Sequence, residues 1–233
     1  THSIFYTPFY VAMEKGFYAL DIETEELTLL NDPEGDLPCN RFNDGKCDEA
    51  GRFWAGTMDR NGNTNQGSLY RLDTDMNCKK MLDGLTISNG LAWDTKKQKM
   101  YFIDTPTKKI VSFDYDADSG DISNKKVVVQ FPEGEGVPDG MTIDDEGMIW
   151  VAHWGGGKVS RWNPETEEFL EQILIPATQV TSCVFGGKDL DELYITTARE
   201  DLSEKSLLSQ PKAGGIFKIR VGVKGGPTFF FRG

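Results

Sequence analysis

The sequence predicts an all-β protein of the β-propeller class, and a repeat in the chain is the main reason. Strand-like segments recur around Tyr10, Trp54, Tyr101, Trp150 and Tyr194, which follow one another at intervals of 44 to 49 residues. After each of them come a turn and a second alternating segment. A period near 45 residues with several short strands per copy is typical of propeller blades. We therefore expect about five blades in a single domain that spans residues 1–233.

The first recognisable strand of each repeat is short and rich in aromatic and branched residues, which favour strands. The five segments are FYVAM from Phe9, FWAGTM from Phe53, MYFID from Met100, IWVAHW from Ile149 and LYITTA from Leu193. The next strand of each repeat follows after a turn. These segments are GFYALDIETEE from Gly16, SLYRLDTDMN from Ser68, KIVSFDYDADSG from Lys109, KVSRWNPETEE from Lys158 and GIFKIRV from Gly215.

The connections support antiparallel hairpins, because DDEG, ADSG and WGGG place Gly and Asp where tight turns need them. No stretch shows a long helical period bounded by caps, so the chain is expected to be almost entirely β. Blades packed around a closed ring also protect the edges of many short strands. A β-sandwich is the alternative, but it does not explain a repeat of this length.

Three small polar residues occupy one register in successive repeats. Asn43, Asn89 and Asp139 each lie 11 or 12 residues before the aromatic anchor of their repeat, and each is in a turn-like sequence with Gly. Equivalent positions in a ring of blades converge on its axis, so their oxygens are predicted to meet at the channel mouth. Amide and carboxylate oxygens suit hard cations such as calcium, magnesium or manganese, and zinc accepts carboxylate oxygen. Plain turn chemistry is the alternative for any one of them.

The composition limits the classes of partner. Asp and Glu outnumber Lys and Arg by 37 to 25, and a formal charge of −12 repels nucleic acid and anionic lipid. The chain has no apolar run long enough for a membrane span, and its first residues lack the order of a signal peptide. The chain has four cysteines without a CxxC pair and only two histidines, His2 and His153, which argues against a thiolate zinc site and favours free thiols. A soluble, cytoplasmic protein is expected.

Arg41 and His153 are the other candidates for chemistry. Arg41 stands two residues before Asn43, where its guanidinium could bind a carbonyl or hydroxyl oxygen of a ligand. A surface ion pair is the alternative for Arg41. His153 follows the strand residue Ala152 and is predicted to be a packed or rim histidine rather than a base.

Several motifs resemble the SMP-30/gluconolactonase/luciferin-regenerating enzyme family, to which regucalcin belongs. The resemblance runs almost end to end from about Phe17. It is carried by NRFNDGKCDEAGRFWAGTMD, ISNGLAWD, VPDGMTIDDEGMIWVAHWGGGKVSRWNPET, TSCVFGG and AGGIFKI, which come in the family's order with similar spacing.

The resemblance implies a six-bladed propeller that holds one divalent cation and hydrolyses sugar lactones such as glucono-lactone. Carried onto this chain, it makes Asn89 and Asp139 metal ligands, and it makes Arg41 and Asn43 substrate-binding residues. In the enzyme interpretation, Asp139 also accepts a proton from the attacking water.

One departure from the family pattern concerns the metal. The family's third protein ligand is a Glu in a GESPVW-like stretch of the first blade, and this sequence has no such stretch. Glu14 is expected in a hairpin turn and does not substitute for it, and neither Asp59 nor Asn61 clearly matches a further acidic residue of the family. Either the first blade is missing from this chain, which we favour, or the ring closes with five blades.

Two other functions stay open at this point. The first is a non-catalytic calcium-binding propeller whose faces dock partners. The second is a pseudoenzyme whose incomplete metal site binds no ion. For the enzyme, the expected partner is a small sugar lactone, and the expected oligomeric state is a monomer.

Overall fold

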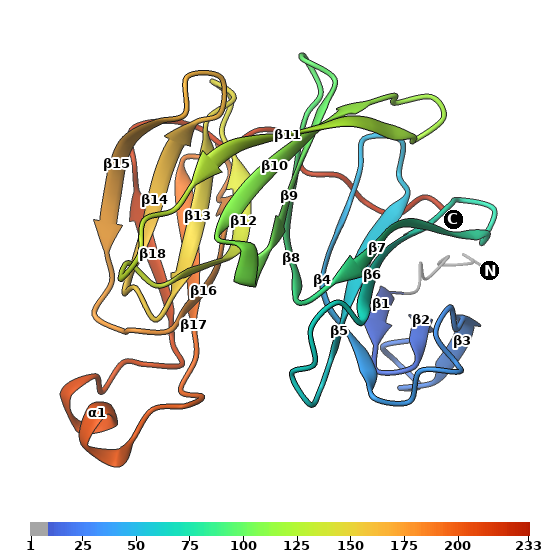
Figure 1. Cartoon of the computed structure of the whole chain (residues 1–233), viewed down its shortest axis with the longest axis horizontal. Helices are drawn as coiled ribbons and strands as arrows, with labels where there is room; N and C mark the ends of the chain where they lie inside the picture. The colour runs from blue at the N-terminus through green and yellow to red at the C-terminus, as the bar shows by residue number, and fades with distance from the viewer. Residues whose placement is uncertain (1–8) are drawn as a thin grey trace, which may run out of the picture. The chain divides into compact units, whose positions relative to one another are not determined.

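The computed structural model describes residues 9–233 as five antiparallel sheets (Figure 1). The chain forms two compact units, one that runs up to Ser88 and includes Phe229–Gly233, and one formed by Asn89–Thr228. His2 and the first part of the N-terminal stretch compared with signal peptides lie outside the described residues.

The first unit contains two sheets whose strands follow chain order. The first sheet is formed by β1 (Phe9–Met13), β2 (Gly16–Leu20) and β3 (Leu27–Asn31). The second is formed by β4 (Asn40–Cys47), β5 (Phe53–Asp59), β6 (Gly67–Leu72) and β7 (Cys78–Leu85). Every neighbouring pair is antiparallel, as short hairpin connections require.

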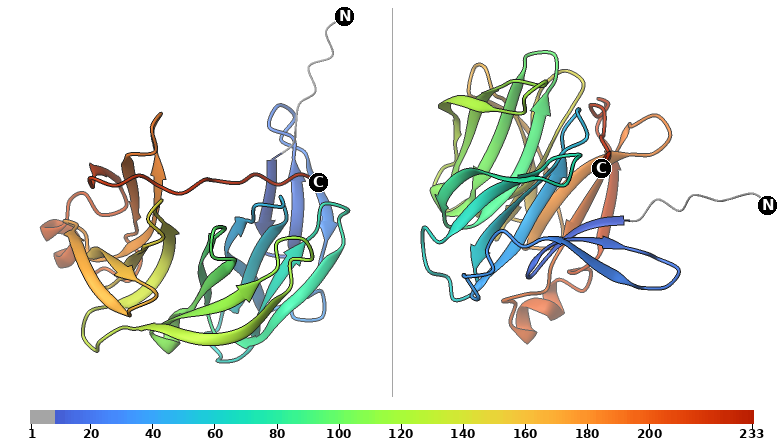
Figure 2. Two further views of the ribbon diagram at one scale, coloured as in Figure 1. Left: turned by 90° about the horizontal axis from the view of Figure 1, so that it is seen from above. Right: turned by 90° about the vertical axis from the view of Figure 1, so that its right-hand side faces the viewer.

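The second unit contains three sheets of the same kind, and their strong twist is visible in Figure 2. The first is formed by β8 (Ser88–Asp94), β9 (Lys99–Asp104), β10 (Lys109–Tyr115) and β11 (Ile122–Gln130). The second is formed by β12 (Val137–Ile143), β13 (Ile149–Trp154), β14 (Lys158–Asn163) and β15 (Glu168–Leu174). The third is formed by β16 (Val180–Gly186), β17 (Glu192–Thr197) and β18 (Ile216–Arg220).

The predicted strand pairs are confirmed in all five repeats. The aromatic anchors lie in β1, β5, β9, β13 and β17, and the segments predicted to follow them form β2, β6, β10, β14 and β18. Two short helices interrupt the β structure of the described residues: a 3₁₀ turn, η1 (Thr105–Thr107), and α1 (Glu204–Ser209). Neither is long and apolar enough to cross a membrane.

The helix α1 was not predicted, because six residues are too few to show a helical period. It lies in the connection between β17 and β18, shown in orange in Figure 1. The hydroxyl of Ser203 accepts a hydrogen bond from the backbone N–H of Ser206 at 3.2 Å and caps the helix.

The cores lie between consecutive sheets within each unit. In the first unit, the ring of Phe17 on β2 packs on Phe42 of β4, with ring centroids 4.7 Å apart, and on Phe53 of β5 at 5.4 Å. In the second unit, one cluster joins residues of β8–β11 to residues of β12–β14, and another joins residues of β13 and β14 to residues of β16 and β17. Side chains that alternate along each strand therefore hold one sheet against the next.

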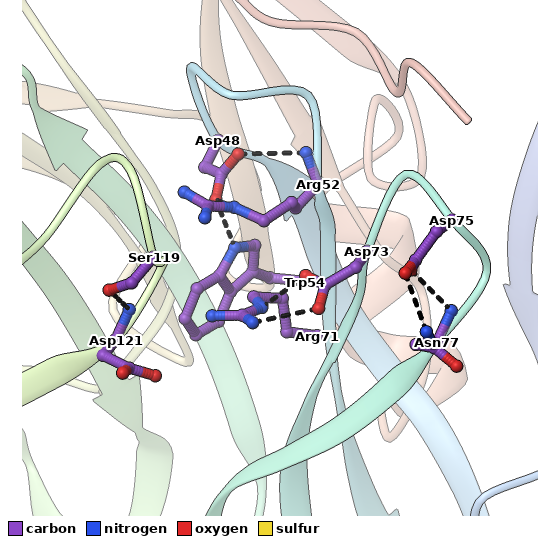
Figure 3. Close-up of polar contacts among 9 residues, drawn as sticks. All are labelled: Asp48, Arg52, Trp54, Arg71, Asp73, Asp75, Asn77, Ser119 and Asp121. Atoms are coloured by element: carbon purple, nitrogen blue, oxygen red, sulfur yellow. Dashed lines mark hydrogen bonds and ion pairs between the residues drawn. The ribbon is translucent and has the colours of Figure 1, made fainter.

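A buried carboxylate fixes the hairpin between β4 and β5. One Asp48 oxygen accepts hydrogen bonds from the Trp54 indole N–H at 2.8 Å and from Nε of Arg52 at 2.7 Å, as Figure 3 shows. The second unit repeats the arrangement: the Asp144 carboxylate accepts the indole N–H of Trp150 at 2.9 Å. In both cases the Trp lies six positions after the Asp, so each of the two tryptophan anchors has its own polar restraint.

Candidate functional site

Asn43 and Asp139 occupy β-bulges inside strands. We expected Asn43, Asn89 and Asp139 in turns before a strand, and this expectation is wrong for all three, since β4, β8 and β12 include them. In β12, Pro138 pairs with His153 and Met141 pairs with Val151, so Asp139 and Gly140 stand opposite a single residue of β13. In β4, Asn43 and Asp44 likewise stand opposite a single residue of β5. A bulge redirects a side chain away from the regular alternation, and bulges are frequent beside active sites.

A threonine links Asn89 to the strand that carries Asp139, within the second unit. The side-chain amide of Asn89 donates a hydrogen bond to Oγ1 of Thr105 at 3.1 Å. The Thr105 hydroxyl in turn donates to the carbonyl oxygen of Pro138, the residue before Asp139, at 2.8 Å. Asn89 is 6% exposed and Thr105 is 8% exposed, so this link between β8 and β12 is protected from water.

A glycine lets the two strands approach each other at this point. A Cβ atom placed on Gly90 would lie 2.8 Å from the carbonyl oxygen of Asp139 and 2.9 Å from the backbone nitrogen of Met141. Only a residue without a side chain fits here without moving β8 away from β12. The glycine of the SNG sequence on β8 therefore allows the close contact with the strand of Asp139.

The two side chains offer the oxygen donors that hard cations prefer. Because the Asn89 nitrogen is committed to Thr105, the amide orientation is fixed and its oxygen lies on the opposite arm of the group. An amide oxygen and a carboxylate on neighbouring strands fit a divalent cation that keeps several water ligands. Among the described residues, no group of three His, Cys, Asp or Glu side chains could hold a metal ion. Asn89 and Asp139 are the two candidate ligands that the sequence and this link single out.

Arg41 and Asn43 form a second polar pair, in the first unit. One Arg41 guanidinium nitrogen, Nη1, donates to Oδ1 of Asn43 at 3.0 Å and to the carbonyl oxygen of Phe42 at 2.9 Å. The Asn43 nitrogen donates to the carbonyl oxygen of Ser88 at 2.9 Å. Both arms of the Asn43 amide are therefore occupied, and the residue holds Arg41 instead of offering a free oxygen to a cation.

Asp44, the second residue of this bulge, is a half-buried acid. Its carboxylate accepts a hydrogen bond from the backbone N–H of Gly45 at 2.7 Å. Removal from water raises the pKa of Asp44 above its ordinary value, and the positive charge of Lys46 opposes the shift only in part. These contacts give Asp44 a local structural role in the bulge.

His153 is a packed histidine, as predicted. It is 1% exposed, and its Nε2 lies 2.6 Å from Oγ of Ser160, while its Nδ1 lies 3.1 Å from the carbonyl oxygen of Glu135. The Trp162 indole N–H donates to the same Ser160 oxygen at 2.7 Å. The Ser160 hydroxyl therefore donates to Nε2, and the proton of the neutral ring is on Nδ1. Burial lowers the pKa of His153 to about 4.

Other acidic residues considered for the site serve local structure. Glu14 lies in the turn between β1 and β2, as expected, and forms an ion pair with Arg60 at 2.5 Å. Asp59 accepts a hydrogen bond from the backbone N–H of Asn61 at 2.7 Å and stabilises the turn after β5.

Thr105 is the residue of the candidate centre that sequence reasoning missed. It follows directly after β9, in a turn that contains Pro106, and nothing in the local sequence marks it as a partner of Asn89. Its position shows only in three dimensions, where it reaches a carbonyl that lies 33 residues further along the chain, at Pro138.

Comparison with known proteins gives a consistent family. The family described as SMP-30/Gluconolactonase/LRE-like region matches residues 5–199. A Bacillus subtilis (strain 168) protein provisionally named sugar lactone lactonase YvrE is 45% identical over 215 residues, which are 92% of this chain and 74% of that protein.

Solved structures agree with this result. A luciferin-regenerating enzyme superimposes with a TM-score of 0.91 at 33% identity, covering 100% of this chain and 80% of the other. A calcium-binding protein, regucalcin, from Agrobacterium tumefaciens strain C58 has a TM-score of 0.91 at 31% identity, covering 97% and 76%. The five sheets are thus propeller blades, and the chain belongs to the SMP-30/gluconolactonase/LRE-like family.

Proposed function

We propose that this protein hydrolyses sugar lactones and depends on a divalent cation held by Asn89 and Asp139. The observation that carries the proposal is the link from the Asn89 amide through Thr105 to the strand of Asp139, with hydrogen bonds of 3.1 Å and 2.8 Å. Family membership and the similarity to a lactonase support the reaction class. The calcium-binding protein among the structural relatives supports a cation.

Calcium, magnesium, manganese and zinc all accept the oxygen ligands that this pair offers. A bound cation of this kind would supply Lewis-acid polarisation of the lactone carbonyl. Asn89 contributes a neutral oxygen whose direction Thr105 fixes, and Asp139 contributes negative charge. The two side chains together therefore provide affinity and orientation.

Asp139 is the proposed general base. In the reaction, water adds to the carbonyl carbon, the ring C–O bond breaks, and the ring oxygen receives a proton to leave a hydroxy acid. Asp139 takes the proton that the water loses and returns it to the leaving oxygen, so atoms and charge balance. The bulge that redirects the Asp139 side chain is consistent with this role.

Arg41 and Asn43 keep the proposed role of substrate binding. Among the described residues, the Arg41 guanidinium is held by a carbonyl and a carboxamide and forms no ion pair with a carboxylate, so it retains donors for an oxygen of a ligand. Asn43 positions Arg41 and is itself fixed by the Ser88 carbonyl. The cytoplasmic location and the monomeric state remain predictions.

A non-catalytic calcium-binding protein is the second candidate. It is favoured by one observation, namely that the described residues contain no group of three His, Cys, Asp or Glu side chains that could hold a metal ion, so the centre proposed for catalysis lacks a third acidic ligand. Such a protein would bind a cation but would release no acid from a lactone.

Acid release from a panel of sugar lactones separates these functions. The protein is assayed after chelation and again after addition of calcium, manganese, zinc or magnesium. We expect hydrolysis that chelator abolishes and a metal restores. Metal binding without acid release would support the calcium-binding protein, and hydrolysis that chelator does not affect would overturn the metal dependence.

A further inference from the structure

The bulge that carries Asp139 has a counterpart on the next inner strand. In β16, Val180 pairs with Thr197 and Ser182 pairs with Thr196, so Thr181 is an extra residue with no partner position on β17. Thr197 lies three residues after the anchor Tyr194, as His153 lies three residues after Trp150.

This register aligns Thr181 with Asp139. The strand residue paired with Thr197 is Val180, and the one paired with His153 is Pro138. The next residue along each inner strand is Thr181 in one case and Asp139 in the other. The propeller repeat thus presents a threonine at the position that a candidate metal ligand holds on the neighbouring blade.

The two bulges also lie against each other within the second unit. A Cβ atom placed on Gly140 would be only 2.3 Å from Oγ of Ser182 and 2.9 Å from its Cα. Gly140 follows Asp139, and Ser182 follows Thr181, so the backbones of β12 and β16 meet directly beside both residues. Glycine at position 140 is what allows this approach.

The hydroxyl of Thr181 forms a hydrogen bond with the hydroxyl of a second threonine, Thr196. Its Oγ1 lies 2.7 Å from Oγ1 of Thr196, which is exposed on β17, whereas Thr181 itself is half-buried. One hydroxyl donates to the other, so the pair retains one O–H donor and several acceptor lone pairs. A neutral pair of this kind, on the strand that packs beside the strand of Asp139, suits a ligand that bears neutral hydroxyl groups.

We infer that Thr181, supported by Thr196, binds a hydroxyl group of the substrate and gives the enzyme its preference for polyhydroxylated lactones. This inference rests on the proposed lactonase function and names a residue that determines specificity. A site that hydrogen-bonds a substrate hydroxyl discriminates against an analogue that lacks it, because the polar groups of the site are then left unpaired.

The test compares two lactones and three variants. D-Glucono-δ-lactone carries ring hydroxyls, and δ-valerolactone has the same ring without them. Thr181→Val replaces the hydroxyl with a methyl group of similar size, Thr181→Ser retains it, and Thr28→Val makes the same change on the exposed strand β3. We expect Thr181→Val to lower kcat/KM for the gluconolactone about tenfold or more while leaving δ-valerolactone unchanged. Thr181→Ser and Thr28→Val should behave like the parent protein.

The remaining outcomes are decisive as well. Equal losses on both lactones would show a structural effect, and no loss on either would show that the hydroxyl binds nothing; both results overturn the inference. If the parent protein hydrolyses neither lactone, the proposed function fails, and the inference is then decided by calorimetric binding of gluconate and 5-hydroxyvalerate. Gluconate binding that Thr181→Val weakens about tenfold, with 5-hydroxyvalerate unaffected, supports it. Unchanged or absent gluconate binding overturns it.

Discussion

Asn89 and Pro138 are joined through the hydroxyl of Thr105, which accepts a hydrogen bond from the Asn89 amide and donates one to the Pro138 carbonyl. The contact ties the orientation of one candidate ligand to the backbone that carries the other, Asp139. A site held in this way needs little reorganisation when a ligand binds, and buried partners fix its direction. The following predictions test its separate parts.

Asp139→Asn should abolish most of the lactone hydrolysis. The amide keeps the size and one oxygen of the side chain but can neither accept the proton of water nor supply a negative charge. Loss of a general base lowers kcat by about 10²- to 10⁴-fold. The measurement is steady-state hydrolysis with saturating metal, and Asp145→Asn, an exposed carboxylate nearby in the sequence, is the matched control. Full activity of Asp139→Asn with its metal bound would refute the base assignment.

Thr105→Val should weaken both the site and the fold. It removes the hydroxyl but keeps the shape, so the Asn89 amide and the Pro138 carbonyl lose a buried partner, at a cost of about 1 to 3 kcal/mol in the free energy of unfolding. Urea denaturation measures the stability, and calorimetry measures cation affinity. Thr105→Ser should restore both, because it returns the hydroxyl. Cation affinity that Thr105→Val leaves unchanged would show that the link has no part in orienting Asn89.

Gly56→Ala should destabilise the first unit through a clash with one side chain. A Cβ atom on Gly56 would lie 1.8 Å from Oγ and 2.4 Å from Cβ of Ser88. Overpacking of this kind costs about 1 to 3 kcal/mol. Ser88→Gly removes both clashing atoms, and the Ser88 hydroxyl has no hydrogen-bond partner among the described residues to lose. The double variant should therefore recover part of the loss in a denaturant double-mutant cycle, and strictly additive losses would contradict the clash.

Stability should fall as the pH drops from about 6.5 to about 4, in part through His153. Burial lowers the pKa of His153 to about 4 in the folded protein, whereas the unfolded chain binds the proton near its ordinary value. The unfolded state therefore holds more protons in this window, and the free energy of unfolding falls as pH falls, by up to about 1.4 kcal/mol per pH unit for one group. The contribution of His153 to the free energy of unfolding is fully present at pH values above its pKa in the unfolded chain.

Urea unfolding of the parent protein and of His153→Gln, at a series of pH values, measures this contribution. The difference between the two slopes isolates His153 from carboxylates that titrate in the same range. We expect the variant to be less stable at pH 7 but flatter with pH between about 6.5 and about 4. Equal slopes would mean that the pKa of His153 is the same in the folded and unfolded states, which would contradict the effect of burial.

The fold was predictable because its signal is repeated and local. Aromatic and branched residues alternate in every blade, and the anchors Trp54 and Trp150 are buried where the period places them. Helix α1 was missed because six residues are too few to show an apolar face with helical periodicity, and only the Ser203 cap marks its start.

The candidate site was predictable in part. Asn89 and Asp139 stood out because the same register returned in successive repeats. The sequence did not show that these residues lie inside strands. A small polar residue followed by Gly is typical of a turn as well as of a bulge, and the pairing between strands decides between the two. Thr105 and Thr181 were not predicted, because their roles arise from contacts between segments that are distant in sequence.

Calorimetric titration with Mn²⁺ tests the central claim most directly, and it needs no substrate. The chelator-treated protein is compared with Asn89→Ala, Asp139→Ala and the control Asp145→Asn. One binding event in the parent protein and in the control, lost or weakened at least tenfold in each alanine variant, is the predicted result. Binding of equal strength in all four proteins would contradict a cation centre at Asn89 and Asp139, and so would an absence of binding in the parent protein.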